Sequence, residues 1–326
     1  MRLFGLCVAV WVACASAYAG VLPSQVLDTH AEVTSMRQKG ENLYVSTSQG
    51  EVQIYALAGD VNLKLRLVRR IELPSYEDLF GSSFRPKVFN TDTNARGEIL
   101  IIATGANGSR NLYVCKDENL EVLLENMSIA KALWVSQTQV LVALMSHEIL
   151  LFSTQERRVV YQTQITQASF SDMAYNSRDS ILYTSGESGV VYALDSKSGA
   201  LVGQYNSINK DKVFTISFGG DRLVGAGQDK RLSIYTLQNG SRLVDAAMVK
   251  SEFLIYAAGI DERGEYIGYM SDENGSVRIL RAKDKKPIAT LEGISGVVNS
   301  IVFYKTSVLV SCDDSKIYVF SLQGVL

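Results

Sequence analysis

Short segments in which apolar and polar residues alternate recur along the chain, and this pattern predicts β-strands. Residues 188–205 read SGVVYALDSKSGALVGQY, which is an alternating segment, a polar turn and a second alternating segment. Related segments occur seven times: EVQIYAL (51–57), NLYVCK (111–116), EILLFST (148–154), VVYALDS (190–196), RLSIYTL (231–237), SVRILRA (276–282) and KIYVFSL (316–322). The chain is therefore built from repeats.

The spacing of these segments predicts the architecture. The last apolar residue of each segment serves as an anchor, and successive anchors are 59, 38, 41, 42, 45 and 40 residues apart. A period of about 40–45 residues with four strands per unit is typical of β-propeller blades. The longer first step contains an insertion of about 18 residues beyond that period. We predict an all-β, seven-bladed propeller in a single domain, residues 20–326. The anchors are Tyr55, Val114, Phe152, Ala193, Tyr235, Leu280 and Phe320.

The two ends of the repeat region complement each other. Each repeat contains three further strands, such as KVFTISF (212–218) before an anchor and ALVGQY (200–205) after one. The last repeat lacks its fourth strand, whereas an unassigned strand, SQVLDT (24–29), precedes the first repeat. We therefore predict that the N-terminal strand completes the last blade and closes the ring, which leaves no open seam.

The first nineteen residues, MRLFGLCVAVWVACASAYA, have the pattern of a secretory signal peptide. Arg2 precedes an apolar run, and Ala17-Tyr18-Ala19 forms an A-x-A cleavage site before Gly20. We expect export to the periplasm. The segment around Cys14, VWVAC, offers an alternative, because it resembles a bacterial lipoprotein signal and would make the protein a lipid-anchored one. The rest of the chain has no apolar stretch of about 18 residues, so we expect no transmembrane segment.

Composition narrows the possible partners. The chain is 47% apolar and 20% charged, with a net charge of −2 and no basic block, which argues against nucleic acid as a partner. After signal removal two cysteines remain, Cys115 and Cys312. The predicted blade order places them on opposite faces and two blades apart, beyond the distance that a disulfide spans. We expect two buried free thiols and a monomeric protein.

The repeats resemble the WD-repeat class of seven-bladed propellers in period and pattern. The Trp-Asp dipeptide that ends such repeats is absent, and IYTL, VFSL and IYAL stand in its place. The segment VVYALDSKSG resembles the repeat unit of propellers related to quinoprotein dehydrogenases, which also occurs in the propeller lipoprotein of outer-membrane barrel assembly. The ending GQDKRLSIYTL … SKIYVFSL is similar to the accessory propeller protein of the periplasmic nitrate reductase system.

Motifs for catalysis are missing from the sequence. The two histidines, His30 and His147, are too few for a three-histidine zinc site, and C-x-x-C, H-E-x-x-H, C-x-x-C-H and G-x-S-x-G do not occur. The acidic runs at 271–274 and 312–315 lack the spacing of a calcium loop. We expect no enzyme, catalytic residue, metal or cofactor. The alternatives are a quinone-dependent or other propeller enzyme and an outer-membrane assembly lipoprotein.

We predict a protein-docking platform or accessory factor, serving a periplasmic protein partner such as a respiratory nitrate reductase. One face of the ring would carry the connections between blades and the turns between second and third strands. The insertion PSYEDLFGSSFRP (74–86) lies on this face, and aromatic residues rimmed by polar ones suit a protein contact. Alternatively, Phe80 and Phe84 pack over the blade and only cap it. The candidate partner-binding residues are Tyr76, Leu79, Phe80, Phe84, Arg85, Arg110, His147, Glu187, Asp229, Arg231, Asp272 and Asp313.

Overall fold

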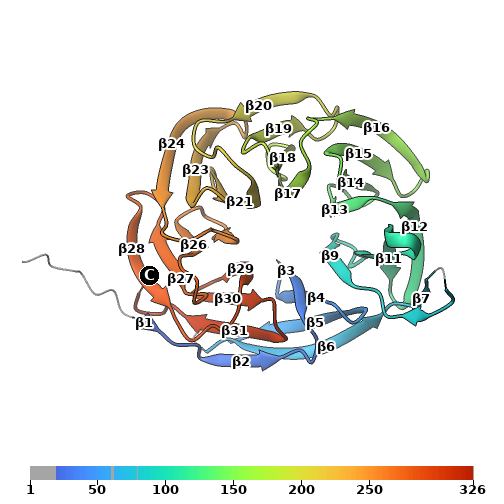
Figure 1. The fold of residues 1–326 in the computed structure, drawn as a ribbon, viewed down its shortest axis with the longest axis horizontal. Helices are drawn as coiled ribbons and strands as arrows, with labels where there is room; N and C mark the ends of the chain where they lie inside the picture. Colours follow the sequence, from blue (N-terminus) through green and yellow to red (C-terminus); the bar gives the residue numbers. More distant parts are fainter. Residues whose placement is uncertain (1–19, 60–61, 79, 326) are drawn as a thin grey trace, which may run out of the picture.

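The structure is a computed structural model that describes residues 20–59, 62–78 and 80–325. Seven sheets of four or five strands are arranged as the blades of a ring around a central channel, and a small two-stranded sheet stands apart from them, so the chain is an all-β, seven-bladed propeller (Figure 1). The predicted signal peptide, residues 1–19, lies outside the described residues.

Each blade contains four antiparallel strands, which we call a, b, c and d from the channel outward. They follow the chain in every blade except blade 7, whose strand d comes from the N-terminal end. Blade 1 contains β3 (Val33–Lys39), β4 (Asn42–Thr47), β5 (Glu51–Ala58) and β6 (Lys64–Glu72). Blade 2 contains β9 (Val88–Thr93), β10 (Ile99–Thr104), β11 (Arg110–Lys116) and β12 (Asn119–Met127), with a short 3-10 helix, η1 (Ala106–Gly108), between β10 and β11. Blade 3 contains β13 (Ile129–Trp134), β14 (Gln139–Leu144), β15 (Glu148–Ser153) and β16 (Arg158–Gln164). Blade 4 contains β17 (Phe170–Asn176), β18 (Ile181–Gly186), β19 (Val191–Asp195) and β20 (Leu201–Tyr205).

The last three blades include the two strands nearest the N-terminus. Blade 5 contains β21 (Val213–Gly219), β22 (Arg222–Gly227), β23 (Arg231–Gln238) and β24 (Arg242–Lys250). Blade 6 contains β25 (Ala258–Ile260), β26 (Tyr266–Met270), β27 (Val277–Arg281) and β28 (Lys286–Leu291), with β1 (Gly20–Val21) as a parallel fifth strand. Blade 7 contains β29 (Val298–Tyr304), β30 (Ser307–Cys312) and β31 (Lys316–Ser321), and β2 (Gln25–Asp28) is its outer strand.

The predicted closure is confirmed. Strand β2 pairs antiparallel with β31, with Gln25 opposite Val319 and Asp28 opposite Lys316. In Figure 1 the two ends of the ribbon meet in the same part of the ring, next to β1, β2 and β31. The parallel addition of β1 to blade 6 was not predicted from the sequence, because two residues are too few to show a strand pattern.

The apolar side chains are buried between neighbouring blades. Seven hydrophobic clusters occupy the described part of the chain, each formed by one pair of adjacent blades. This explains the near-continuous apolar runs of strands b and c, since a sheet covered on both faces buries successive residues of a strand. Strands d are mainly exposed, because they form the outer rim of the ring.

The outer strands share a local irregularity. In six blades a β-bulge falls on an aliphatic residue of strand d, namely Val68, Leu123, Val160, Val202, Val244 and Ile288. A bulge interrupts the regular row of backbone groups that another strand would pair with. The bulges therefore protect the exposed rim of the ring against edge-to-edge association.

Candidate functional site

The insertion between blades 1 and 2 forms a small hairpin and is not a structureless loop. Strand β7 (Tyr76–Glu77) pairs with β8 (Ser83–Phe84), and the rings of Tyr76 and Phe84 lie 5.9 Å apart. The Asp78 carboxylate accepts hydrogen bonds from the backbone N–H groups of Phe80 and Ser82 at 2.9 and 2.8 Å. The hairpin therefore has its own internal order.

The tip of this hairpin is exposed. The side chain of Phe80 is 91% exposed and that of Phe84 is 46% exposed. The alternative in which both phenylalanines pack over the blade is therefore wrong, because Phe80 is almost fully exposed and Phe84 packs against Tyr76 of the hairpin itself. Leu79, also predicted to bind a partner, lies outside the described residues.

The base of the hairpin is fixed to blade 1. Pro86 is buried against the β4–β5 turn at Gly50, and the Leu73 N–H donates to the Gly50 carbonyl at 2.8 Å. Arg85 is exposed and lies 3.8 Å from the Glu51 carboxylate. A rigid base with exposed aromatic residues at its end suits the binding of another protein.

Three of the predicted acidic residues hold turns on this face of the ring, which we call the insertion face and which comprises the b–c turns and the connections between blades. Asp229 accepts a hydrogen bond from the Lys210 N–H and Asp313 from the Val297 N–H, each at 2.8 Å. Asp272 accepts two bonds within its own turn. Of these, Asp313 is exposed and the other two are half-buried. Glu187 is also exposed on this face.

The other two predicted arginines, Arg110 and Arg231, also make contacts within the ring. Arg110 is half-buried, its guanidinium lies 3.5 Å from the centroid of the Phe89 ring, and it donates to the Ile129 carbonyl at 3.0 Å. Burial lowers the pKa of Arg110. Arg231 donates to the Ile208 carbonyl at 2.7 Å and lies 3.6 Å from Asp229. Both side chains thus join neighbouring elements.

The prediction that His147 is displayed on the insertion face is wrong. Its side chain is fully buried in the β14–β15 turn, packed edge-on against Phe170 and Tyr192. Nε2 lies 3.0 Å from the Thr184 hydroxyl and Nδ1 lies 3.3 Å from the Ala168 carbonyl. Because a carbonyl only accepts, Nδ1 donates and Nε2 accepts from Thr184, which is the neutral imidazole. His147 is a structural residue between blades 3 and 4.

Burial lowers the pKa of His147 to about 4. The unfolded chain binds this proton near pH 6.5, so its contribution to stability is complete above that pH and is lost as the pH falls toward 4. We expect a loss of about 3 kcal/mol between pH 7 and pH 4, since one pKa unit corresponds to about 1.4 kcal/mol. Urea unfolding at both pH values would measure it. The His147→Gln variant should lose this part of the pH dependence; an unchanged dependence would contradict the assignment.

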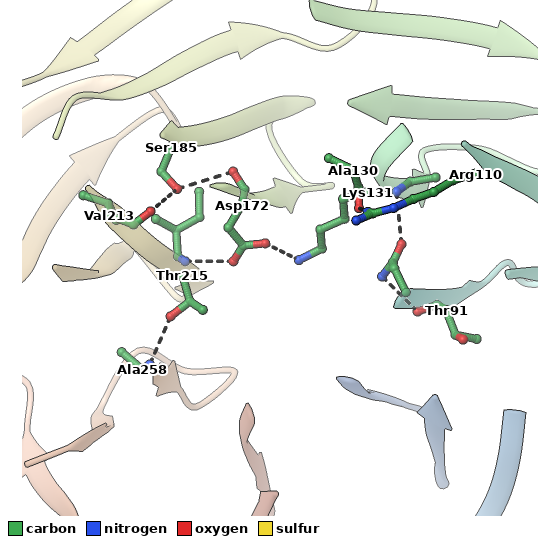
Figure 2. A network of polar contacts seen from close by, with 12 residues as sticks. Thr91, Arg110, Ala130, Lys131, Asp172, Ser185, Val213, Thr215 and Ala258 are labelled. Atoms are coloured by element: carbon green, nitrogen blue, oxygen red, sulfur yellow. Dashed lines mark hydrogen bonds and ion pairs between the residues drawn. The ribbon is translucent and has the colours of Figure 1, made fainter. Parts of the chain in front are cut away.

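The central channel contains a cavity of about 1290 Å³ lined mainly by the a strands. Polar side chains link neighbouring a strands around it (Figure 2). Lys131 Nζ lies 2.6 Å from Asp172 Oδ1, and Asp172 Oδ2 accepts the Ile216 N–H at 2.9 Å. The Thr215 hydroxyl accepts the Ala258 N–H at 3.2 Å. Among the described residues, no group of three His, Cys, Asp or Glu side chains is placed to hold a metal ion.

Sequence reasoning missed an aromatic cluster on the insertion face, at the connection between blades 5 and 6. The rings of Phe214 and Tyr256 lie 5.0 Å apart, those of Tyr256 and Phe253 lie 6.3 Å apart, and Lys212 lies 5.8 Å from the Phe214 ring. All three rings are partly exposed. Phe214 is the extra residue of a bulge in its a strand, a position that Ser171 holds in blade 4, where it lines the channel. The sequence did contain one signal for this cluster: an aromatic residue, Phe214, at the bulge position near the start of strand a.

The two thiols are as predicted. Cys115 lies one residue before the end of strand c of blade 2 and Cys312 ends strand b of blade 7, and both are free and buried. Burial raises the pKa of both thiols, that of Cys312 to about 12, although Arg69 beside Cys115 acts in the opposite direction. Neither environment favours the thiolate form that reactive cysteines need.

Comparison with known proteins supports the fold alone. No protein-family model matches the chain, and no curated protein matches its sequence. A solved structure, the β-propeller domain of Cps50 (Swd1) from Myceliophteria thermophila, superimposes with a TM-score of 0.71 at 14% sequence identity. The match covers 92% of this chain and 98% of that domain. Within the described residues, no helix has the length and hydropathy needed to cross a membrane.

Proposed function

We propose that this propeller is a non-catalytic docking platform that binds a protein partner on its insertion face. The observation that carries this proposal is the exposure of Phe80 at the end of an ordered hairpin whose base is anchored on blade 1. Burying an exposed aromatic side chain in a partner is a major source of binding energy, and such anchors dominate protein interfaces.

The aromatic cluster Phe214, Tyr256 and Phe253 adds a second contact region on the same face. The hairpin lies in the connection from blade 1 to blade 2, and Phe253 and Tyr256 lie in the connection from blade 5 to blade 6. Phe214 stands at the start of strand a of blade 5, beside Tyr256, so both regions belong to the insertion face. In Figure 1 the hairpin strand β7 and blade 6 lie on opposite sides of the channel. A partner that contacts both regions would cover the channel opening.

We propose a periplasmic partner, in particular a respiratory reductase such as nitrate reductase. The support is the signal-peptide pattern of residues 1–19 together with the resemblance to the accessory propeller of that reductase system. Isolation of the tagged protein from the periplasm, followed by mass spectrometry, would test it. A reductase subunit among the recovered proteins is expected, and recovery of the tagged protein only from the cytoplasm would contradict it.

Replacing both exposed phenylalanines should weaken partner binding at least tenfold, because each ring loses its apolar contact. The double variant Phe80→Ser with Phe84→Ser should leave the melting temperature within about 1 °C of the parent protein, since exposed substitutions change stability little. Affinity of the purified partner, measured by calorimetry, is the readout.

A matched control is available on the rim of blade 4. Leu201 and Val202 are 55% and 44% exposed on the outer strand β20, away from the hairpin. Leu201→Ser with Val202→Ser likewise replaces two exposed apolar side chains with serine and should leave binding unchanged. Equal affinities for the hairpin variant and the parent protein would remove the hairpin from the docking site.

A further inference from the structure

The segment that begins at Gly20 fastens two blades together. Its first two residues pair with β28 of blade 6, and the Glu292 N–H donates to the Val21 carbonyl at 2.9 Å. At Ser24 the chain reaches blade 7, where the backbone N–H and the side-chain hydroxyl donate to the Val319 carbonyl at 2.8 and 3.0 Å. Figure 1 shows β1 and β2 crossing from β28 to β31.

A carboxylate lies against the first residue of this segment. A β-carbon on Gly20 would be 2.8 Å from Glu292 Oε2 and 3.1 Å from Oε1. Standard backbone geometry then puts the Gly20 nitrogen within roughly 5 Å of Oε2. Glu292 is exposed and has no ion pair with any cationic side chain in the described parts of the chain. The carboxylate is thus placed beside a backbone nitrogen that is neutral while the chain is continuous.

Cleavage before Gly20 would change the charge at this nitrogen. Signal peptidase hydrolyses the Ala19–Gly20 amide with one water, which leaves a carboxylate on Ala19 and an amine on Gly20 that is mainly protonated at neutral pH. We propose that the new α-ammonium group pairs with Glu292, so that the processed chain gains an ion pair that fastens β1 to blade 6. This inference rests on the export proposed above.

The ion pair should be visible as slower opening of β1. Two forms of the protein are needed: one whose first residue is Gly20 and one with Gly-Ser added before it. In the first form, we expect Glu292→Gln to speed amide hydrogen exchange at residue 292, the donor to Val21, about two- to fivefold at low salt, as for an exposed ion pair. In the extended form the substitution should have no effect.

Glu273→Gln, an exposed glutamate elsewhere in blade 6, serves as the matched control and should not alter exchange at residue 292. Equal responses to Glu292→Gln in the two forms, or no response in either, would overturn the ion pair. N-terminal sequencing of the exported protein tests the cleavage, with Gly20 expected first. A protein that keeps residues 1–19 would overturn export and cleavage together, whereas a correct N-terminus without the exchange difference would overturn only the ion pair.

Discussion

Removal of residues 20–28 should lower the free energy of unfolding by about 5 kcal/mol and the melting temperature by at least 10 °C. The deletion removes β2, so the ladder from Gln25 to Asp28 along β31 is lost and blade 7 is left with three strands. It also removes Leu27, which packs against the hydrophobic cluster between blades 7 and 1. Calorimetry on the purified protein would measure the change.

Deletion of residues 20–23 alone provides the matched control. It removes β1 and its two pairs with blade 6 but keeps β2 in place. We expect this shorter deletion to cost about 1 kcal/mol, since it removes little buried surface. If the two deletions lowered the free energy of unfolding equally, the pairing of β2 with blade 7 would contribute nothing to the stability of the ring.

Closing the ring stabilises the propeller because it adds one more buried interface between blades. Each hydrophobic cluster joins only two adjacent blades, so a ring has as many clusters as blades, whereas an open array has one fewer. A strand from the opposite end of the chain makes blade 7 depend on both termini. Unfolding of blade 7 would therefore open the ring and remove hydrophobic contacts with both neighbouring blades.

The blade order, the strand period and the closing strand could be predicted because each depends on local patterns. The apolar runs of strands b and c are long, and the turn residues between them recur at similar intervals, so the period was measurable. The missing strand at one end and the extra strand at the other were matched by counting. These features need no knowledge of side-chain packing.

The candidate site was harder to predict because exposure depends on tertiary contacts. His147 lies in a polar turn of the kind usually found at the surface, yet neighbouring blades cover its ring completely. Asp229 and Asp272, which were predicted as partner contacts, bond to turn amides and are half-buried, and their contact with a partner stays a prediction. The cluster joins Phe214 of blade 5 to Tyr256 and Phe253 of the connection to blade 6, about 40 residues later in the chain, and their proximity follows only from the fold.

Replacing Asp172 with alanine should destabilise the protein by about 4 kcal/mol, although the residue is remote from the proposed docking hairpin. Its buried carboxylate joins three consecutive blades, since it pairs with Lys131 of blade 3 and accepts the Ile216 N–H of blade 5 (Figure 2). The variant leaves a largely buried ammonium group and a buried N–H without their partner. Urea unfolding gives the change in free energy.

Thr215→Ala tests whether the charge of Asp172, and not only its position, causes this effect. Thr215 holds the corresponding place on the a strand of blade 5 and accepts one backbone N–H, from Ala258 of blade 6. Loss of this single neutral bond should cost about 1 kcal/mol. Adding Lys131→Met to Asp172→Ala should recover part of the lost stability, because no unpaired ammonium remains. Equal costs for the Asp172 and Thr215 variants, with no recovery, would mean that the ion pair adds nothing beyond one inter-blade hydrogen bond.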